Sequence, residues 1–197
     1  MGKGIRVVIV HGWMGTSKND WMPWLGRELK KRGIKASVLD MPDTRYPVMS
    51  KWNEHLSKSI GKPSKNTFLV GHSLGGQAVL RYLANQKGKA KIGGALIVAS
   101  WINRRKKRFA SKANKKLITP WLKTPFAWNK ILTHTKNFTA IYSDNDPYVP
   151  MSAGKIIRQK LGAKFVLAHN KWHFNSSKYP IVLSELLLLI ERANQKS

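Results

Sequence analysis

Residues 71–76 constrain the fold of this chain more than any other part of its sequence. They read Gly-His-Ser-Leu-Gly-Gly and have the form Gly-x-Ser-x-Gly around Ser73. An apolar run, residues 67–70, directly precedes them, and a helical pattern, residues 77–83, directly follows. Small residues are needed beside the serine in such a turn, because the backbone passes close to its own strand and helix. The pattern predicts a strand, a strained turn and a helix, with the Ser73 hydroxyl above the sheet edge and the helix N-terminus facing any negative charge that develops there.

Apolar runs and helical patterns alternate along most of the chain. The runs typical of buried strands are residues 5–10, 35–39, 66–70, 92–99, 137–143 and 164–167. The patterns typical of helices are residues 20–32, 50–60, 75–86, 126–132, 152–161 and 180–193. This alternation predicts an α/β fold with about six mostly parallel strands and helices on both faces of the sheet. Because no linker or repeat divides the 197 residues, we expect a single domain over residues 1–197.

The alternation breaks down in residues 101–130. This segment contains ten Lys or Arg residues and no Asp or Glu. We expect a basic, lid-like insertion over the sheet edge, near the site, rather than a core element. The whole chain carries 36 Lys and Arg against 9 Asp and Glu, a formal charge of +27, which favours attraction to polyanions.

Residues that can carry chemistry follow the predicted strands, at the edge where parallel sheets bind ligands. Ser73 follows the third strand, Asp144 and Asp146 follow the fifth, and His169 and His173 follow the sixth. A histidine can take the proton of a serine hydroxyl and make it a nucleophile, and a carboxylate can orient the imidazole. The order Ser, Asp, His is the one expected of an α/β-hydrolase.

Further motifs extend this pattern over nearly the whole chain. They are His11-Gly12-Trp13-Met14-Gly15, Trp21-Met22-Pro23-Trp24-Leu25, Met41-Pro42, Trp52, the turn at residues 71–76, Trp128, Asp146-Pro147-Tyr148-Val149-Pro150 and His173-Phe174. In type, order and spacing they resemble those of small serine hydrolases related to the retinoblastoma-binding hydrolase and its bacterial relatives. The resemblance implies a compact α/β-hydrolase with carboxylester hydrolase activity on small substrates. It selects Asp146 over Asp144 and His173 over His169 as partners of the nucleophile Ser73.

The surroundings of the serine are expected to supply two further functions. The backbone amides of Leu74 and Trp13 are the expected oxyanion hole, which stabilises the negative charge of the tetrahedral intermediate. The side chains expected to contact substrate are Trp13, Met14, Trp101 and Trp172. The family that the chain resembles usually has a small residue where Trp172 stands, so this tryptophan is expected to narrow the pocket.

The expected activity is hydrolysis of small carboxylic esters through an acyl-enzyme. An amide or thioester substrate stays open, because acyl specificity depends on the shape of the pocket. The alternative is a catalytically weak or inactive protein of the same fold that binds polyanions or protein partners through its basic surface. The residues expected to contact nucleic acid or an anionic membrane are Arg104, Arg105, Lys106, Lys107 and Arg108.

No cofactor or metal site is expected. The chain has no Cys, which excludes disulfides and thiolate metal sites and agrees with a reducing compartment. The sequence shows no secretory signal, N-myristoylation pattern or apolar run of transmembrane length, so we expect a cytoplasmic protein without a transmembrane segment.

Overall fold

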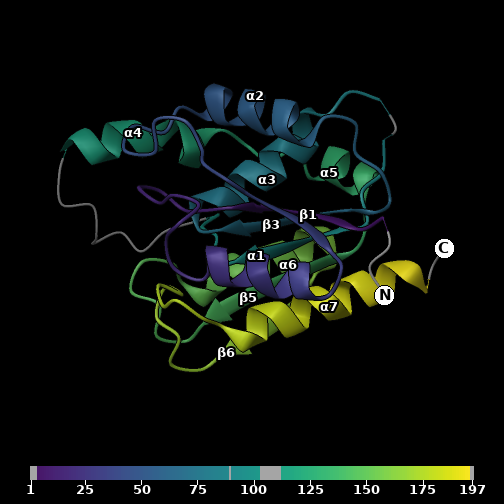
Figure 1. Cartoon of the computed structure of the whole chain (residues 1–197). Coiled ribbons are helices and arrows are strands. Elements are labelled where there is room, and N and C mark those ends of the chain that lie inside the picture. Colours follow the sequence, from purple (N-terminus) through teal and green to yellow (C-terminus); the bar gives the residue numbers. More distant parts are fainter. Residues whose placement is uncertain (1–3, 89, 103–111, 196–197) are drawn as a thin grey trace.

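The computed structural model of the chain describes residues 4–88, 90–102 and 112–195 (Figure 1), with the side chains of residues 112–115 left out of the description. Its centre is a sheet of six parallel strands. They are β1 (Arg6–Val10), β2 (Lys35–Leu39), β3 (Thr67–His72), β4 (Gly94–Val98), β5 (Phe138–Ser143) and β6 (Lys164–Ala168). The predicted parallel α/β sheet is therefore confirmed.

The order of the strands determines where a site can form. The strands lie side by side in the order β2-β1-β3-β4-β5-β6. From β1 the chain moves to β2 on one side, and from β3 onward it moves in the opposite direction across the sheet. A crevice forms at such a change of direction, beyond the carboxyl ends of the strands, here between β1 and β3. Because β1 begins near the N-terminus at the right of Figure 1, this edge lies toward the left of that view.

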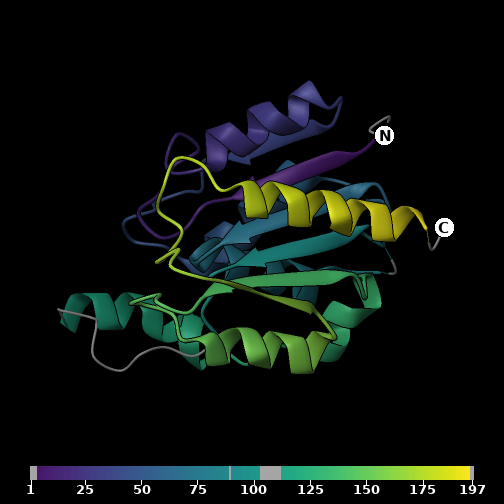
Figure 2. The same ribbon diagram turned by 90° about the horizontal axis from the view of Figure 1, so that it is seen from below.

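Helices cover both faces of the sheet and form two apolar cores. One core packs α1 (Met22–Lys31) and α7 (Pro180–Asn194) against the sheet. Figure 2, seen from below, shows α7 lying over the sheet on this face and running roughly along the strands. The other core contains side chains of the remaining helices, α2 (Met49–Ile60), α3 (Leu74–Asn85), α4 (Lys112–Lys123), α5 (Trp128–His134) and α6 (Met151–Leu161). Among the residues described, no helix has both the length and the apolar character that crossing a bilayer requires.

The segment 101–130 differs from the prediction, because it contains a helix that joins the core. Ile118 and Trp121 of α4 are buried together with side chains of α2 and α3. The indole nitrogen of Trp121 donates a hydrogen bond of 3.0 Å to the carbonyl oxygen of Pro47. Its ring also packs edge to face against Trp52, with centroids 5.6 Å apart. The expectation that this segment is not a core element was wrong for α4, because its apolar residues at helical spacing lie between lysines in the sequence.

A buried arginine holds the C-terminal end of α4. Arg81 of α3 donates hydrogen bonds to the carbonyl oxygens of Trp121 (2.7 Å) and Thr124 (3.0 Å). The last carbonyl groups of a helix have no partner within it, so these bonds satisfy acceptors that would otherwise be orphaned. The guanidinium carbon lies 4.3 Å from the ring centroid of Phe126, and burial lowers the pKa of Arg81 to about 10. The expected basic cluster at residues 104–108 lies outside the described part of the chain.

Candidate active site

Ser73 occupies a strained turn between β3 and α3. Its backbone has φ 53° and ψ −117°, a combination that residues other than glycine rarely adopt. A Cβ at Gly71 would lie 2.5 Å from the Cα of Gly76, and one at Gly75 would lie 2.4 Å from the carbonyl oxygen of Val10. Larger side chains would therefore collide with backbone at these glycines. The small residues of the motif are what allow the strand, the turn and the helix to pack this closely.

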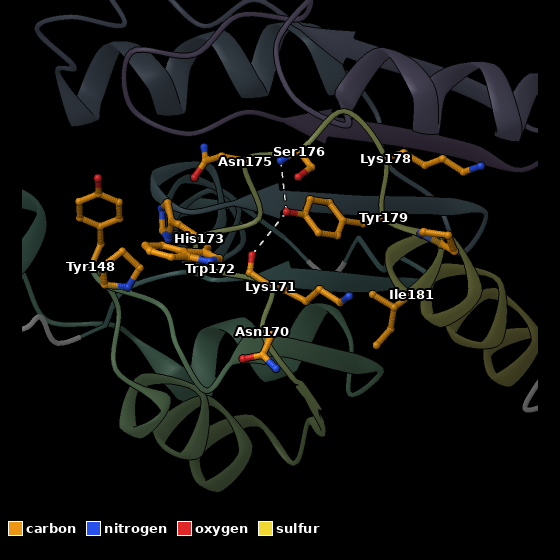
Figure 3. A pocket seen from close by; sticks show the side chains of 12 residues that line it. Tyr148, Asn170, Lys171, Trp172, His173, Asn175, Ser176, Lys178, Tyr179 and Ile181 are labelled. Atoms are coloured by element: carbon orange, nitrogen blue, oxygen red, sulfur yellow. Dashed lines mark hydrogen bonds between the residues drawn. The ribbon is translucent and has the colours of Figure 1, made fainter.

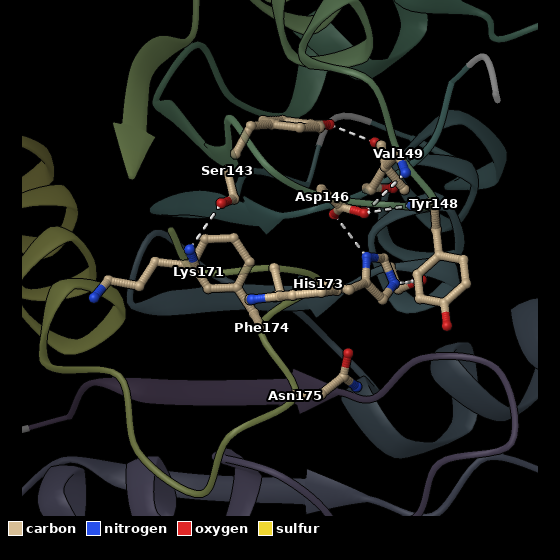
Figure 4. Close-up of polar contacts among 12 residues, drawn as sticks. Ser143, Asp146, Tyr148, Val149, Lys171, His173, Phe174 and Asn175 are labelled. Carbon is tan, nitrogen blue, oxygen red and sulfur yellow. Dashed lines mark hydrogen bonds and ion pairs between the residues drawn. The ribbon is translucent and has the colours of Figure 1, made fainter. Parts of the chain in front are cut away.

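Ser73 forms a chain of hydrogen bonds with a histidine and a carboxylate from two other loops. Figure 4 shows His173 and Asp146 of this chain. The distance from Ser73 Oγ to His173 Nε2 is 2.9 Å, and that from His173 Nδ1 to Asp146 Oδ2 is 2.7 Å. The second oxygen of Asp146 accepts the backbone amides of Tyr148 at 2.8 Å and Val149 at 2.9 Å. Because a carboxylate only accepts hydrogen bonds, Nδ1 of His173 carries a proton and Nε2 of the neutral ring can accept the serine proton.

Two buried side chains hold the backbone of the loop that carries His173, residues 169–179 between β6 and α7, here called the histidine loop. His72 Nε2 donates a hydrogen bond of 2.8 Å to the carbonyl oxygen of His173, and Trp21 Nε1 donates one of 3.1 Å to that of Phe174. Burial, assisted by repulsion from His173, lowers the pKa of His72 to about 3. His72 is therefore neutral at physiological pH and acts as a hydrogen-bond donor.

The histidine loop contains three residues in the left-handed region, Asn170 (φ 56°), Trp172 (φ 50°) and Phe174 (φ 58°). Such backbone persists only where its surroundings hold it. Asn145, from the loop after β5, accepts the backbone amide of Trp172 at 2.8 Å through its Oδ1. The same oxygen accepts the Ser143 hydroxyl at 2.8 Å. The sequence analysis did not identify Asn145 or Ser143 as supports of this loop. The only signal for them in the sequence was that two small polar residues lie at the end of the predicted fifth strand.

A second aspartate–histidine pair lies beside the first. His169 Nδ1 and Asp144 Oδ2 are 2.6 Å apart, and the other oxygen of Asp144 accepts the Asn170 amide at 2.9 Å. The hydrogen bond from the Asn170 backbone amide, followed by the one with His169, lowers the pKa of the Asp144 carboxyl. His169 of this pair is exposed and Asp144 is partly buried, and the hydrogen bond of Ser73 Oγ runs to His173 instead.

The loop after β1 is held against the serine by a neutral histidine. His11 Nε2 accepts the backbone amide of Met41 at 3.0 Å, so its Nδ1 donates the 2.7 Å bond to the Gly12 carbonyl oxygen. Burial lowers the pKa of His11, although the bond to Gly12 and the charge of Asp40 oppose this shift. A Cβ at Gly12 would lie 3.1 Å from the Cβ of Ser73, which shows how closely this loop passes the turn.

The other residues expected at the site lie in different surroundings. Trp13 directly follows Gly12, and Leu74 is the first residue of α3, where a backbone amide has no acceptor within the helix. Met14 is exposed, and Trp172 exposes 64% of its surface. Trp101, in contrast, is buried in the larger core.

An open cavity of about 770 Å³ borders His173 (Figure 3). Tyr148, Trp172 and His173 lie together at one end, and the Lys171 side chain points toward Ile181 at the other. Within residues 4–88, 90–102 and 112–195, no group of three or more metal-ligating side chains could hold a metal ion.

Comparisons with known proteins place the chain among serine hydrolases. The serine hydrolase family is matched over residues 7–180. The chain is 30% identical over 169 residues to YdeN of Bacillus subtilis (strain 168), described as a hydrolase, which covers 86% of this chain and 85% of that protein. It is 24% identical over 179 residues to the serine hydrolase RBBP9 of Rattus norvegicus, covering 90% of this chain and 86% of that protein.

Solved structures support the same assignment. The crystal structure of the ydeN gene product superposes with a TM-score of 0.85 at 29% identity, covering 95% of this chain and 99% of that one. Est1E from Butyrivibrio proteoclasticus has a TM-score of 0.71 at 16% identity, covering 95% of this chain and 88% of that one, which shows the fold alone. The predicted resemblance is confirmed, and the chain belongs to the serine hydrolase family.

Proposed function

We propose that this serine hydrolase cleaves small carboxylic esters through an acyl-enzyme on Ser73. His173 is the general base and acid, and Asp146 is the carboxylate that orients it. The observation that carries the proposal is the continuous hydrogen-bonded chain from Asp146 through His173 to Ser73, at a strained turn. Each member is buried or nearly so, which excludes competing water from these bonds.

The proposed reaction follows from this geometry in two steps. Ser73 Oγ attacks the ester carbonyl while its proton passes to His173 Nε2, and Asp146 stabilises the imidazolium that forms. His173 then gives this proton to the leaving alcohol. In the second step a water molecule, activated by His173, attacks the acyl carbon and releases the acid with Ser73 restored.

The oxyanion of each tetrahedral intermediate needs donors that are already in position. We assign this role to the backbone amides of Leu74 and Trp13, because one opens α3 and the other follows Gly12 beside Ser73. Loss of one such donor typically lowers kcat about a hundred- to a thousandfold. Contacts of substrate with the side chains of Trp13, Met14, Trp101 and Trp172 stay predictions, as do the single domain and the cytoplasmic location.

Labelling with a fluorophosphonate probe, followed by mapping of the adduct, tests the proposed nucleophile. We expect the adduct on Ser73, and we expect Ser73→Ala to abolish both labelling and hydrolysis of p-nitrophenyl acetate. Ser57→Ala, at an exposed position of α2, is the control and should react like the wild type. An adduct on another residue, or equal rates for Ser73→Ala and the wild type, would overturn the mechanism.

Binding of polyanions through residues 104–108 stays the alternative function, supported by the formal charge of +27. Such binding would survive Ser73→Ala and weaken steeply with salt. Retention on DNA or anionic vesicles that is unchanged in high salt would contradict it.

A further inference from the structure

An apolar groove of about 650 Å³ lies between α4 and the segment that leads into α2. Its lining residues are Tyr46, Pro47, Val48, Met49, Ser50, Lys116, Leu117, Pro120 and Trp121. Lys116 is the only charged residue among them. The volume and the predominantly apolar lining are those of a site for a small molecule.

Two large apolar side chains of this groove are exposed. Tyr46 exposes 60% of its surface and Val48 exposes 43%. Scattered exposed apolar residues are ordinary, but neighbouring ones that share a concave surface indicate a binding site. The groove can therefore gain stability from an apolar occupant.

Hydrogen bonds hold both walls of the groove in place. Trp121, in the α4 wall, donates its indole N–H to the Pro47 carbonyl oxygen in the opposite wall, at 3.0 Å. Arg81 fixes the end of α4 through the carbonyl oxygens of Trp121 and Thr124. The groove is thus formed before any ligand binds, which reduces the entropy lost on binding.

Two hydrogen bonds tie the loop that passes Ser73 to the residues just before the groove. The backbone amide of Met14 donates to the Thr44 carbonyl oxygen at 3.0 Å, and the indole of Trp13 donates to that of Arg45 at 3.1 Å. The groove begins at the next residue, Tyr46. Its other wall, α4, lies beside α2 toward the left of Figure 1, on the side away from both termini and at the edge where the strands end.

We propose that this groove binds the acyl chain of the substrate, and that the preferred substrates are esters of medium- or long-chain fatty acids. The inference rests on the proposed ester hydrolysis and specifies its substrate class. An aliphatic chain suits this predominantly apolar lining, in which Tyr46, Ser50, Lys116 and Trp121 are the side chains able to form hydrogen bonds. A sugar or peptide acyl group would bring more polar atoms than these side chains can pair. Each methylene that the groove buries is expected to raise kcat/KM by about fourfold.

A series of p-nitrophenyl esters from acetate to decanoate tests the proposal, because the leaving group is the same throughout. We expect kcat/KM of the wild type to rise at least about tenfold from butyrate to decanoate, measured below the concentration at which the decanoate aggregates. Val48→Asp places a charge in the groove and should abolish this gain while changing acetate hydrolysis less than about twofold. Leu117→Asp, in the opposite wall, should do the same.

The chain offers a closely matched control. Leu188 on α7 exposes 42% of its surface, against 43% for Val48, so Leu188→Asp introduces the same charge at a similarly exposed site outside the groove. It should leave the chain-length profile unchanged. Val48 is the N-cap residue of α2, where aspartate is favoured, so Val48→Asp is expected to fold.

Several outcomes would overturn the proposal. They are a flat chain-length profile in the wild type, an equal loss for acetate and decanoate in Val48→Asp, and an equal effect of Leu188→Asp. A change of oligomeric state in Val48→Asp would also overturn it, because the groove would then be covered by a second copy of the chain.

Binding to the Ser73→Ala variant separates this inference from the proposed function. If the wild type hydrolyses no ester, the proposed function fails, but calorimetry can still compare decanoate with butyrate as ligands. Tighter binding of decanoate that Val48→Asp removes would support the groove, and equal binding of the two acids would refute it.

Discussion

Acidification below pH 6.5 is expected to destabilise the fold through His72. This side chain is buried and donates its Nε2 proton to the His173 carbonyl oxygen, and burial lowers its pKa from 6.5 to about 3. In the unfolded chain His72 therefore binds a proton below pH 6.5, whereas in the folded protein His72 binds it only near pH 3. The stabilisation is fully present above pH 6.5 and is lost as the pH falls from 6.5 toward 3.

The size of the effect follows from the shift. Within this window one proton separates the unfolded from the folded state, so each pH unit lowers the free energy of unfolding by about 1.4 kcal/mol. Between pH 7 and pH 5 the loss from His72 alone is about 2 kcal/mol, since only part of the first unit lies below its unfolded pKa. His11, whose pKa burial also lowers, acts in the same direction. Carboxylates with lowered pKa, such as Asp144, contribute mainly below pH 5.

The prediction can be measured by urea unfolding at pH 7, 6 and 5, followed by tryptophan fluorescence. His72→Gln keeps an N–H donor for the same carbonyl but cannot titrate. Between pH 7 and pH 5, the free energy of unfolding of this variant should therefore fall by about 2 kcal/mol less than that of the wild type. Ser57→Ala, which removes no titratable group and lies at an exposed position of α2, is the control and should retain the wild-type pH dependence. Equal pH dependence in His72→Gln and the wild type would refute the reasoning.

Three further predictions address the serine turn, the orienting carboxylate and the α4 anchor. Asp146→Asn should lower kcat by about three to four orders of magnitude with an unchanged circular dichroism spectrum, because the imidazole loses its orienting charge. Asp144→Asn should stay within about threefold of the wild type, and similar losses in both variants would contradict the assignment. Gly75→Ala should cost about 3 kcal/mol or more in urea unfolding, since its Cβ would lie 2.4 Å from backbone oxygens. Gly26→Ala, which meets only a side-chain methyl at 3.3 Å, should change stability by about 1 kcal/mol or less. Arg81→Met should lower stability by about 2 kcal/mol, because helix-end carbonyl groups lose their donor, and unchanged unfolding would show that the anchor is dispensable.

The fold could be predicted because its signals are local. Buried parallel strands are continuous apolar runs, and the helices between them have apolar residues at helical spacing. The segment 101–130 was harder to interpret, because Ile118 and Trp121 of α4 are surrounded by basic residues. Arg81 is a cation within an apolar helix, which weakly indicates a buried polar contact. Its acceptors could not be predicted, because they are carbonyl groups 40 or more positions later in the sequence.

The candidate site could be predicted in part. The order of Ser73, Asp146 and His173 along the chain and their places after strands were sufficient to select them as candidates, while two aspartates and two histidines remained possible until the family resemblance was considered. In the structure each histidine is hydrogen-bonded to one of the aspartates, His169 to Asp144 and His173 to Asp146. Of these two histidines, His173 is the one that is hydrogen-bonded to the Ser73 hydroxyl. Their catalytic roles stay a proposal for the experiments above.

What the sequence determined by itself is the type of each element and the glycine-rich turn, because periodicity and backbone sterics act over a few residues. What only the tertiary structure decided is how side chains distant in sequence meet. His72 became a neutral donor to His173 because packing excluded water from its ring. The groove at Val48 exists because α4 folds back against α2, and no local pattern in either segment specifies that contact.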